Sequence, residues 1–103
     1  FAYDVSKAAL NHLMRCVALP LIDAGIRVNA VDIGWTVTPG ERLFTTEAEQ
    51  HEMSQKVIPI KRSAEADEIA AVIEFLCSEE SSYIVGSLVG ADGGFSLRPS
   101  TLV

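Results

Sequence analysis

The feature that most constrains the fold is a helical pattern that gives way, through one glycine, to a run of β-branched residues. Over residues 3–24 the apolar side chains recur every three or four positions, which predicts a long helix whose end is marked by Gly25. Pro20 lies inside this pattern, so we expect a kink or an early end of the helix near Leu19. The run at 26–33 then predicts a largely buried strand that ends at Gly34. A helix that leads through a tight turn into a buried strand is an α/β unit.

The rest of the chain repeats this alternation after a longer connection. After the breaker Pro39-Gly40, the stretch "TTEAEQHEMSQKV" predicts a short amphipathic helix that begins at a capping Thr45 or Thr46. A connection of this length between a strand and the next strong helix is often a lid or a binding loop.

A second strong helix and a second strand close the pattern. Apolar spacing predicts the helix over 65–78, and the run at 88–91 predicts a short strand closed by the turn Asp92-Gly93-Gly94. The order of helix, strand, connection, helix and strand predicts half of a doubly wound α/β sheet. No G-x-G-x-x-G or Walker loop occurs in these residues, so they hold no phosphate-binding loop of their own.

Composition excludes several classes of partner. The net charge of −6 comes from residues 41–80, which contain ten acidic and four basic residues. The simplest interpretation of this acidic segment is a solvated surface. Without a basic stripe we expect no nucleic-acid partner, and without an apolar run of about 18 residues we expect no membrane partner. Neither His12 nor His51 has a second ligand at metal-binding spacing, so we predict no metal site. Cys16 and Cys77 are predicted to be free thiols in a reducing compartment, the cytoplasm.

Tyr3 and Lys7 are the first candidates for chemistry. They stand four residues apart on the predicted helix, so their Cβ atoms lie on one face, about 5–6 Å apart. The phenol of Tyr3 and the ammonium of Lys7 can therefore reach one ligand. An ammonium beside a phenol favours the phenolate by Coulomb attraction, which suits proton transfer. The alternative for the pair alone is two surface side chains on a helix.

Five segments together resemble a known family. They are "Y-x-x-x-K" at Tyr3 and Lys7, "GIRVNAV" at 25–31, "T-x-T-P" before Gly40, "DEIAAVIEFLCSEESSYIVG" at 67–86 and "DGG" at 92–94. In this order and spacing they resemble the C-terminal half of a short-chain dehydrogenase/reductase. The resemblance implies an α/β fold, the C-terminal part of a doubly wound parallel-sheet Rossmann-type fold. It also implies that residues 1–103 are the C-terminal half of a single domain whose Gly-rich cofactor half is absent.

The resemblance further implies an activity and a set of site residues. The parent protein would be an NAD(P)-dependent oxidoreductase that transfers a hydride between nicotinamide and an alcohol or ketone, whereas this fragment alone is expected to be inactive. Tyr3 would be the catalytic acid/base, and Lys7 would assist it and bind the nicotinamide ribose. Gly34, the backbone of Thr36 and the side chain of Thr38 would bind the carboxamide of the cofactor, although Ile33 stands where the family has Pro.

Other expectations from the resemblance concern selectivity, partners and neighbouring residues. The catalytic Ser and Asn of the family, and the residue that selects NAD or NADP, are expected upstream of Phe1. Asn29 is expected to hold the strand and loop by local hydrogen bonds, and Trp35 either lines the substrate pocket or packs in a core. The loop "GWTVTPGE" resembles that of sugar and polyol dehydrogenases. A homo-oligomer is implied, and the alternative function is a non-catalytic relic or an oligomerisation module.

Overall fold

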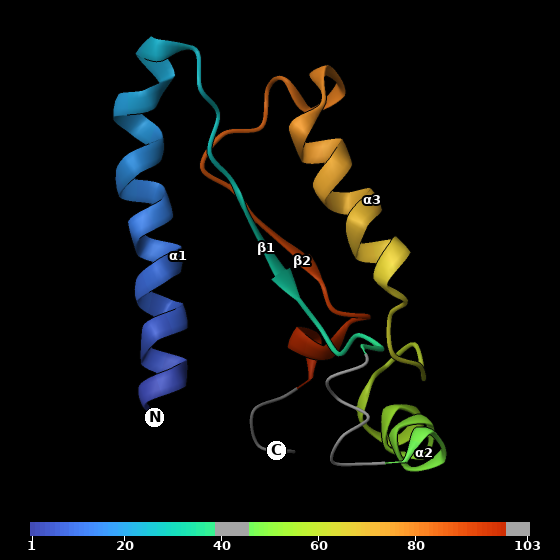
Figure 1. Cartoon of the computed structure of the whole chain (residues 1–103). Coiled ribbons are helices and arrows are strands. Elements are labelled where there is room, and N and C mark those ends of the chain that lie inside the picture. The colour runs from blue at the N-terminus through green and yellow to red at the C-terminus, as the bar shows by residue number, and fades with distance from the viewer. Residues whose placement is uncertain (39–45, 99–103) are drawn as a thin grey trace. The chain divides into compact units, whose positions relative to one another are not determined.

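A computed structural model of the chain describes residues 1–38 and 46–98. Its helices and strands follow the predicted order: α1 (Ala2–Leu21), β1 (Ala30–Ile33), α2 (Glu47–Val57), α3 (Ala66–Cys77) and β2 (Leu88–Ala91) (Figure 1). Short 3₁₀ turns at Ile22–Ala24, Glu79–Ser81 and Phe95–Leu97 connect them. The predicted α3 and β2 are confirmed to within one residue. The expected Pro39-Gly40 turn and the capping alternative Thr45 lie outside the described residues.

The chain forms two compact units. Unit 1 comprises Phe1–Val31 with Ile73–Val89, and unit 2 comprises Asp32–Val72 with Gly90–Val103. Each unit therefore combines segments that are far apart in the sequence, because the division passes through β1, α3 and β2.

β1 and β2 pair in parallel as a two-stranded sheet (Figure 1). The backbone N–H of Ala30 donates to Ser87 O at one end of the pair, and that of Gly34 donates to Ala91 O at the other, both at 2.9 Å. The prediction of a largely buried strand over 26–33 is wrong in two respects. β1 begins only at Ala30, and Ile33 is 50% exposed.

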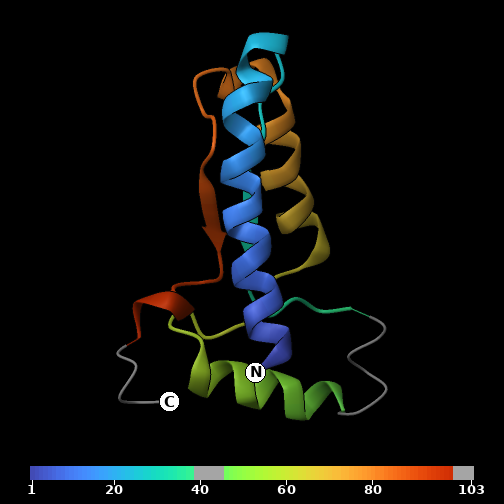
Figure 2. The same ribbon diagram turned by 90° about the vertical axis from the view of Figure 1, so that its left-hand side faces the viewer.

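In unit 1, α1 and the end of α3 lie on opposite sides of the strands (Figures 1 and 2). α1 does not end near Leu19; it continues through Pro20 to Leu21 and then tightens into the 3₁₀ turn. Pro20 is tolerated here because it removes only one backbone hydrogen bond, and this bond belongs to the last turn of the helix. Gly25 ends the segment at φ +73°, as predicted.

Arg27 ties the segment before β1 to the end of α3. Its guanidinium donates five hydrogen bonds of 2.8–3.2 Å, to the carbonyl oxygens of Leu76, Ser78, Ser81 and Ile84 and to the hydroxyl of Ser81. The carbonyls at a helix C-terminus carry partial negative charge, so a half-buried cation is compensated there without a carboxylate.

Asn29 makes side-chain hydrogen bonds to the backbone, as predicted, but its partners are distant in the sequence and not local. Its side-chain amide donates to Ile84 O at 3.0 Å and accepts from the backbone N–H of Ser87 at 2.9 Å. Both bonds attach the segment before β1 to the loop before β2.

In unit 2, the two helices begin at side-chain caps. The hydroxyl of Thr46 accepts from the backbone N–H of Glu49 at 3.2 Å, which confirms the predicted cap of α2. At the start of α3 the carboxylate of Glu68 accepts from the backbone N–H of Glu65 at 3.0 Å, which is the reciprocal half of a capping box. Ile58, directly after α2, and Ile69, in α3, are buried.

The turn after β2 is fixed by Asp92. Its carboxylate accepts from the backbone N–H groups of Gly94 and Ser96, both at 3.0 Å. The hydrogen bonds from Ser96 are the main cause that lowers the pKa of Asp92 below its ordinary value. Gly93 and Gly94 take positive φ angles of +63° and +87°, as the predicted Asp-Gly-Gly turn requires.

Candidate active site

Tyr3 and Lys7 lie on one face of α1, as the spacing predicts. The Nζ atom of Lys7 stands 5.5 Å from the centroid of the Tyr3 ring, and the Tyr3 side chain is 70% exposed. The hydroxyl of Ser6 bonds to the carbonyl of Tyr3 at 2.7 Å and thus serves the helix backbone. The phenol of Tyr3 and the ammonium of Lys7 are therefore accessible to a ligand.

Gly34, Thr36 and Thr38 follow β1 in unit 2. The hydroxyl of Thr36 donates to Gly34 O at 3.0 Å, so its proton is used within the chain. Thr38 is half-buried. The structure thus brings the candidates together in two groups, Tyr3 with Lys7 in unit 1 and the other three in unit 2.

Gly34 has a packing role besides the one predicted for it. A Cβ atom built on Gly34 would lie 2.6 Å from the Cα of Asp92 and 3.0 Å from its Cβ. The absence of a side chain at Gly34 is therefore required for the close approach of the two segments that follow β1 and β2.

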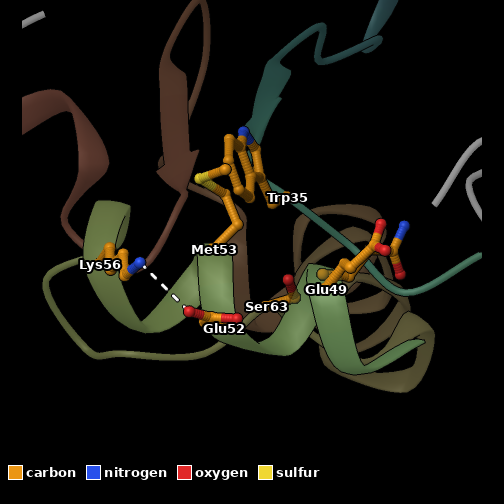
Figure 3. Close-up of a pocket in the computed structure, with 7 residues that line it drawn as sticks. Trp35, Glu49, Glu52, Met53, Lys56 and Ser63 are labelled. Atoms are coloured by element: carbon orange, nitrogen blue, oxygen red, sulfur yellow. Dashed lines mark hydrogen bonds and ion pairs between the residues drawn. The ribbon is translucent and has the colours of Figure 1, made fainter. Parts of the chain in front are cut away.

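Unit 2 contains a cavity of about 510 Å³ between Trp35 and one face of α2 (Figure 3). It is lined by Trp35, Glu49, Gln50, Glu52, Met53, Lys56 and Ser63. The side chain of Met53 extends from α2 toward the indole of Trp35 (Figure 3). Trp35 is 42% exposed and also stands 6.5 Å from the Phe95 ring, so it both lines a pocket and packs against an aromatic neighbour.

The α2 residues that line the cavity are not among the site residues predicted from the sequence, although their spacing indicates that they share one face. Positions 49, 52, 53 and 56 share one helical face by their i, i+3, i+4 and i+7 spacing. What the sequence lacks is an indication that this face meets Trp35.

One ion pair in unit 2 is bidentate. The guanidinium of Arg62 donates to both carboxylate oxygens of Glu68, at 2.6 and 2.9 Å. This hydrogen bonding, followed by the bond from the backbone N–H of Glu65, lowers the pKa of Glu68 to about 2. The same pairing raises the pKa of Arg62. The pair joins the segment before α3 to the first turn of that helix.

Within residues 1–38 and 46–98 no group of three His, Cys, Asp or Glu side chains is placed to hold a metal ion. In the same part of the chain, no helix combines the length and the apolar character needed to cross a bilayer. Cys16 and Cys77 are free, exposed thiols, which confirms the prediction that they do not form a disulfide.

Comparison with known proteins supports an oxidoreductase family. A family model described as "Enoyl-(Acyl carrier protein) reductase" matches residues 1–96. Glucose 1-dehydrogenase of Gluconobacter oxydans is 42% identical over 95 residues, which is 92% of this chain and 36% of that protein. Pteridine reductase 1 of Leishmania tarentolae is 39% identical over 95 residues, covering 92% of this chain and 32% of that protein.

A solved structure has the same fold. The short chain dehydrogenase family protein from Francisella tularensis superposes with a TM-score of 0.82 at 30% identity, over 95% of this chain and 44% of that chain. The chain thus spans about a third of the length of the curated relatives it matches, and its α/β fold is part of a Rossmann-type fold. From the family match, the ordered motifs and the shared fold, the chain belongs to the short-chain dehydrogenase/reductase family.

Proposed function

We propose that the protein acts as an NAD(P)-dependent oxidoreductase that converts an alcohol to a ketone or aldehyde, or the reverse. The observation that carries this proposal is the pairing of Tyr3 with Lys7 on an exposed helix face of a chain from this family. A phenol and an ammonium side by side can exchange a proton with a substrate oxygen and hold a polar ligand beside it.

The two side chains have distinct tasks in this proposal. In reduction the Tyr3 hydroxyl gives a proton to the substrate oxygen, and in oxidation its phenolate takes the proton from the substrate hydroxyl. The Lys7 ammonium, 5.5 Å from the centroid of the Tyr3 ring, donates hydrogen bonds to ribose hydroxyls. Nicotinamide, when bound, supplies or accepts the hydride.

The residues present fit such a cofactor. Within the described part of the chain Lys7 forms no ion pair with an acid, so its donors are available to a ligand. The backbone of Thr36 and the hydroxyl of Thr38 are the groups proposed to bind the carboxamide, and the bond from the Thr36 hydroxyl to Gly34 O fixes that segment. Gly34 contributes by letting the segment approach Asp92.

The relatives do not single out one substrate. One is a glucose dehydrogenase and another is a pteridine reductase, so the proposal extends to small-molecule alcohols and ketones in general. NAD and NADP remain equal candidates, because the residue expected to distinguish them lies outside these 103 residues.

We further propose that these residues are the C-terminal half of a single domain in a cytoplasmic homo-oligomer. Exposed apolar side chains on α1 support association, since Val5, Leu10, Leu13 and Val17 are 66%, 53%, 55% and 37% exposed. Sedimentation equilibrium tests this part of the proposal, and a monomer at all concentrations would contradict it.

The test of the function is calorimetric binding of NAD and NADP to this chain and to the complete product of its reading frame. Binding to the complete product, with turnover of an alcohol, supports the proposal. Binding to neither would reject it in favour of a non-catalytic relic or an oligomerisation module.

A further inference from the structure

We propose that the cavity between Trp35 and α2 holds a ring of the substrate, and that Glu49 selects against substrates with a negative charge on that ring. The inference rests on the proposed function in taking the ligand to be an alcohol or ketone. It goes further by assigning a substrate class, uncharged or cationic ring compounds, and the residues that select it.

The walls of the cavity suit a flat apolar ring. The indole of Trp35 forms one side and the thioether of Met53 points toward it from α2 (Figure 3). Phe95 lies 6.5 Å from the indole with its plane tilted by 31°, and this packing restrains the Trp35 ring. Aromatic faces and a polarisable sulfur bind rings through dispersion and offset stacking. At about 510 Å³ the cavity has the size of a small-molecule site.

The charges of the cavity are unbalanced. Glu52 is bonded to Lys56 at 3.2 Å, so the cation in the lining is already paired with one carboxylate (Figure 3). Glu49 is the remaining carboxylate in the lining, and its backbone is fixed by the cap from Thr46. Within the described residues no ion pair involves Glu49. A ligand carboxylate would therefore meet a like charge, whereas a cation would meet Glu49 and the indole face.

The polar remainder of the lining is neutral. Gln50 and Ser63 offer donors and acceptors that orient a hydroxyl or carbonyl without adding charge. Glu49 is therefore the lining residue that discriminates between ligands by their charge.

Three aryl methyl ketones that differ in charge test the inference. The probes are acetophenone, 4-acetylbenzoate and (4-acetylphenyl)trimethylammonium, in which the substituent para to the acetyl group is hydrogen, a carboxylate or a trimethylammonium group. The chain contains one Trp, so the indole N–H gives one nitrogen–proton correlation peak in the NMR spectrum of the labelled chain. The shift of this peak during titration reports occupation of the cavity and needs neither cofactor nor turnover.

We expect saturable shifts with the neutral and cationic probes and about tenfold weaker binding of 4-acetylbenzoate. In Glu49→Gln the anionic probe should gain about tenfold in affinity while acetophenone changes less than about twofold. Glu47→Gln is the matched control, because it removes the same charge from the same helix at a residue that does not line this cavity.

Three results would overturn the inference. They are the absence of a saturable shift with any probe, no preference against the anion, and an equal gain in Glu49→Gln and Glu47→Gln. If the indole peak behaves as expected but the complete protein binds no NAD(P), the proposed function fails and the ligand site stands. If NAD(P) binds and the probes do not shift the peak, only the site inference fails.

Discussion

The Cα of Gly34 faces the Cα of Asp92 so closely that a methyl group on Gly34 would approach it to 2.6 Å. These two residues follow the ends of β1 and β2, and Asp92 is itself held by bonds from Gly94 and Ser96. Neither backbone can give way easily, since Gly34 is bonded to Ala91 across the sheet.

Gly34→Ala should therefore destabilise the protein by about 1–3 kcal/mol, the usual cost of forcing a methyl group into filled space. Gly90→Ala is the control, because a Cβ there meets no atom within 4 Å and the expected change is below about 0.5 kcal/mol. Urea unfolding of the two variants measures the difference. Equal stability of both would contradict the close packing at Gly34.

Tyr3→Phe should lower kcat of the complete enzyme by about 10²–10⁴-fold, since a positioned acid/base contributes that much. Cofactor affinity should change little, because the ring next to Lys7 is kept. Steady-state kinetics and calorimetry on one preparation separate the two effects. Tyr83→Phe removes a hydroxyl from a fully exposed ring and should leave kcat unchanged; an equal loss in both variants would argue against a catalytic Tyr3.

Arg27→Lys should cost about 1–3 kcal/mol of unfolding free energy although it conserves charge. Lys offers one compact ammonium in place of the planar fork that makes five bonds, so several carbonyls near the end of α3 lose their donor. Arg15→Lys, at an exposed position of α1, is the comparison and should be near neutral. Chemical denaturation of the two variants measures the difference. Similar unfolding midpoints would exclude a stabilising role for the planar guanidinium of Arg27.

Lowering the pH should remove the contribution of the Arg62–Glu68 pair. The pKa of Glu68 in the fold is about 2 against an ordinary value of 4.5, because the ionised carboxylate is bonded to Arg62 and to the Glu65 N–H. Its stabilisation is thus fully present above pH 4.5 and is lost as the pH falls from 4.5 toward 2.

Thermal unfolding of the parent chain and of Glu68→Gln between pH 7 and pH 2 measures this effect. The two melting curves should differ at neutral pH and converge in acid. Glu74→Gln removes a carboxylate from the same helix while leaving the ion pair in place, and its difference from the parent should not follow this course. A constant gap between parent and Glu68→Gln would contradict the lowered pKa.

The elements that the sequence predicts well are those whose signals are local. Apolar periodicity locates α3, the Thr46 cap locates the start of α2, and Gly25 marks the end of the first helical segment. β1 is the exception, because the apolar run at 26–33 does not show which of its side chains another layer covers. The bonds of Arg27 and Asn29 lie in that same stretch and connect it to the end of α3 and the segment after it, more than 45 residues away.

The candidate site also has one part that the sequence predicts and one part that it does not. The i, i+4 spacing suffices to place Tyr3 beside Lys7, since both belong to one helix. The cavity needs Trp35 and α2 to meet across a connection, and spacing within either segment cannot report that meeting.

The discontinuity of unit 1 has a consequence for biosynthesis. Residues 1–31 leave the ribosome before the 41 residues of Asp32–Val72, yet they pack with Ile73–Val89. At ordinary elongation rates of about 5–20 residues per second, α1 waits about 2–8 s for those partners. The rate of translation through residues 32–72 therefore sets how long α1 lacks the partners that it has in unit 1.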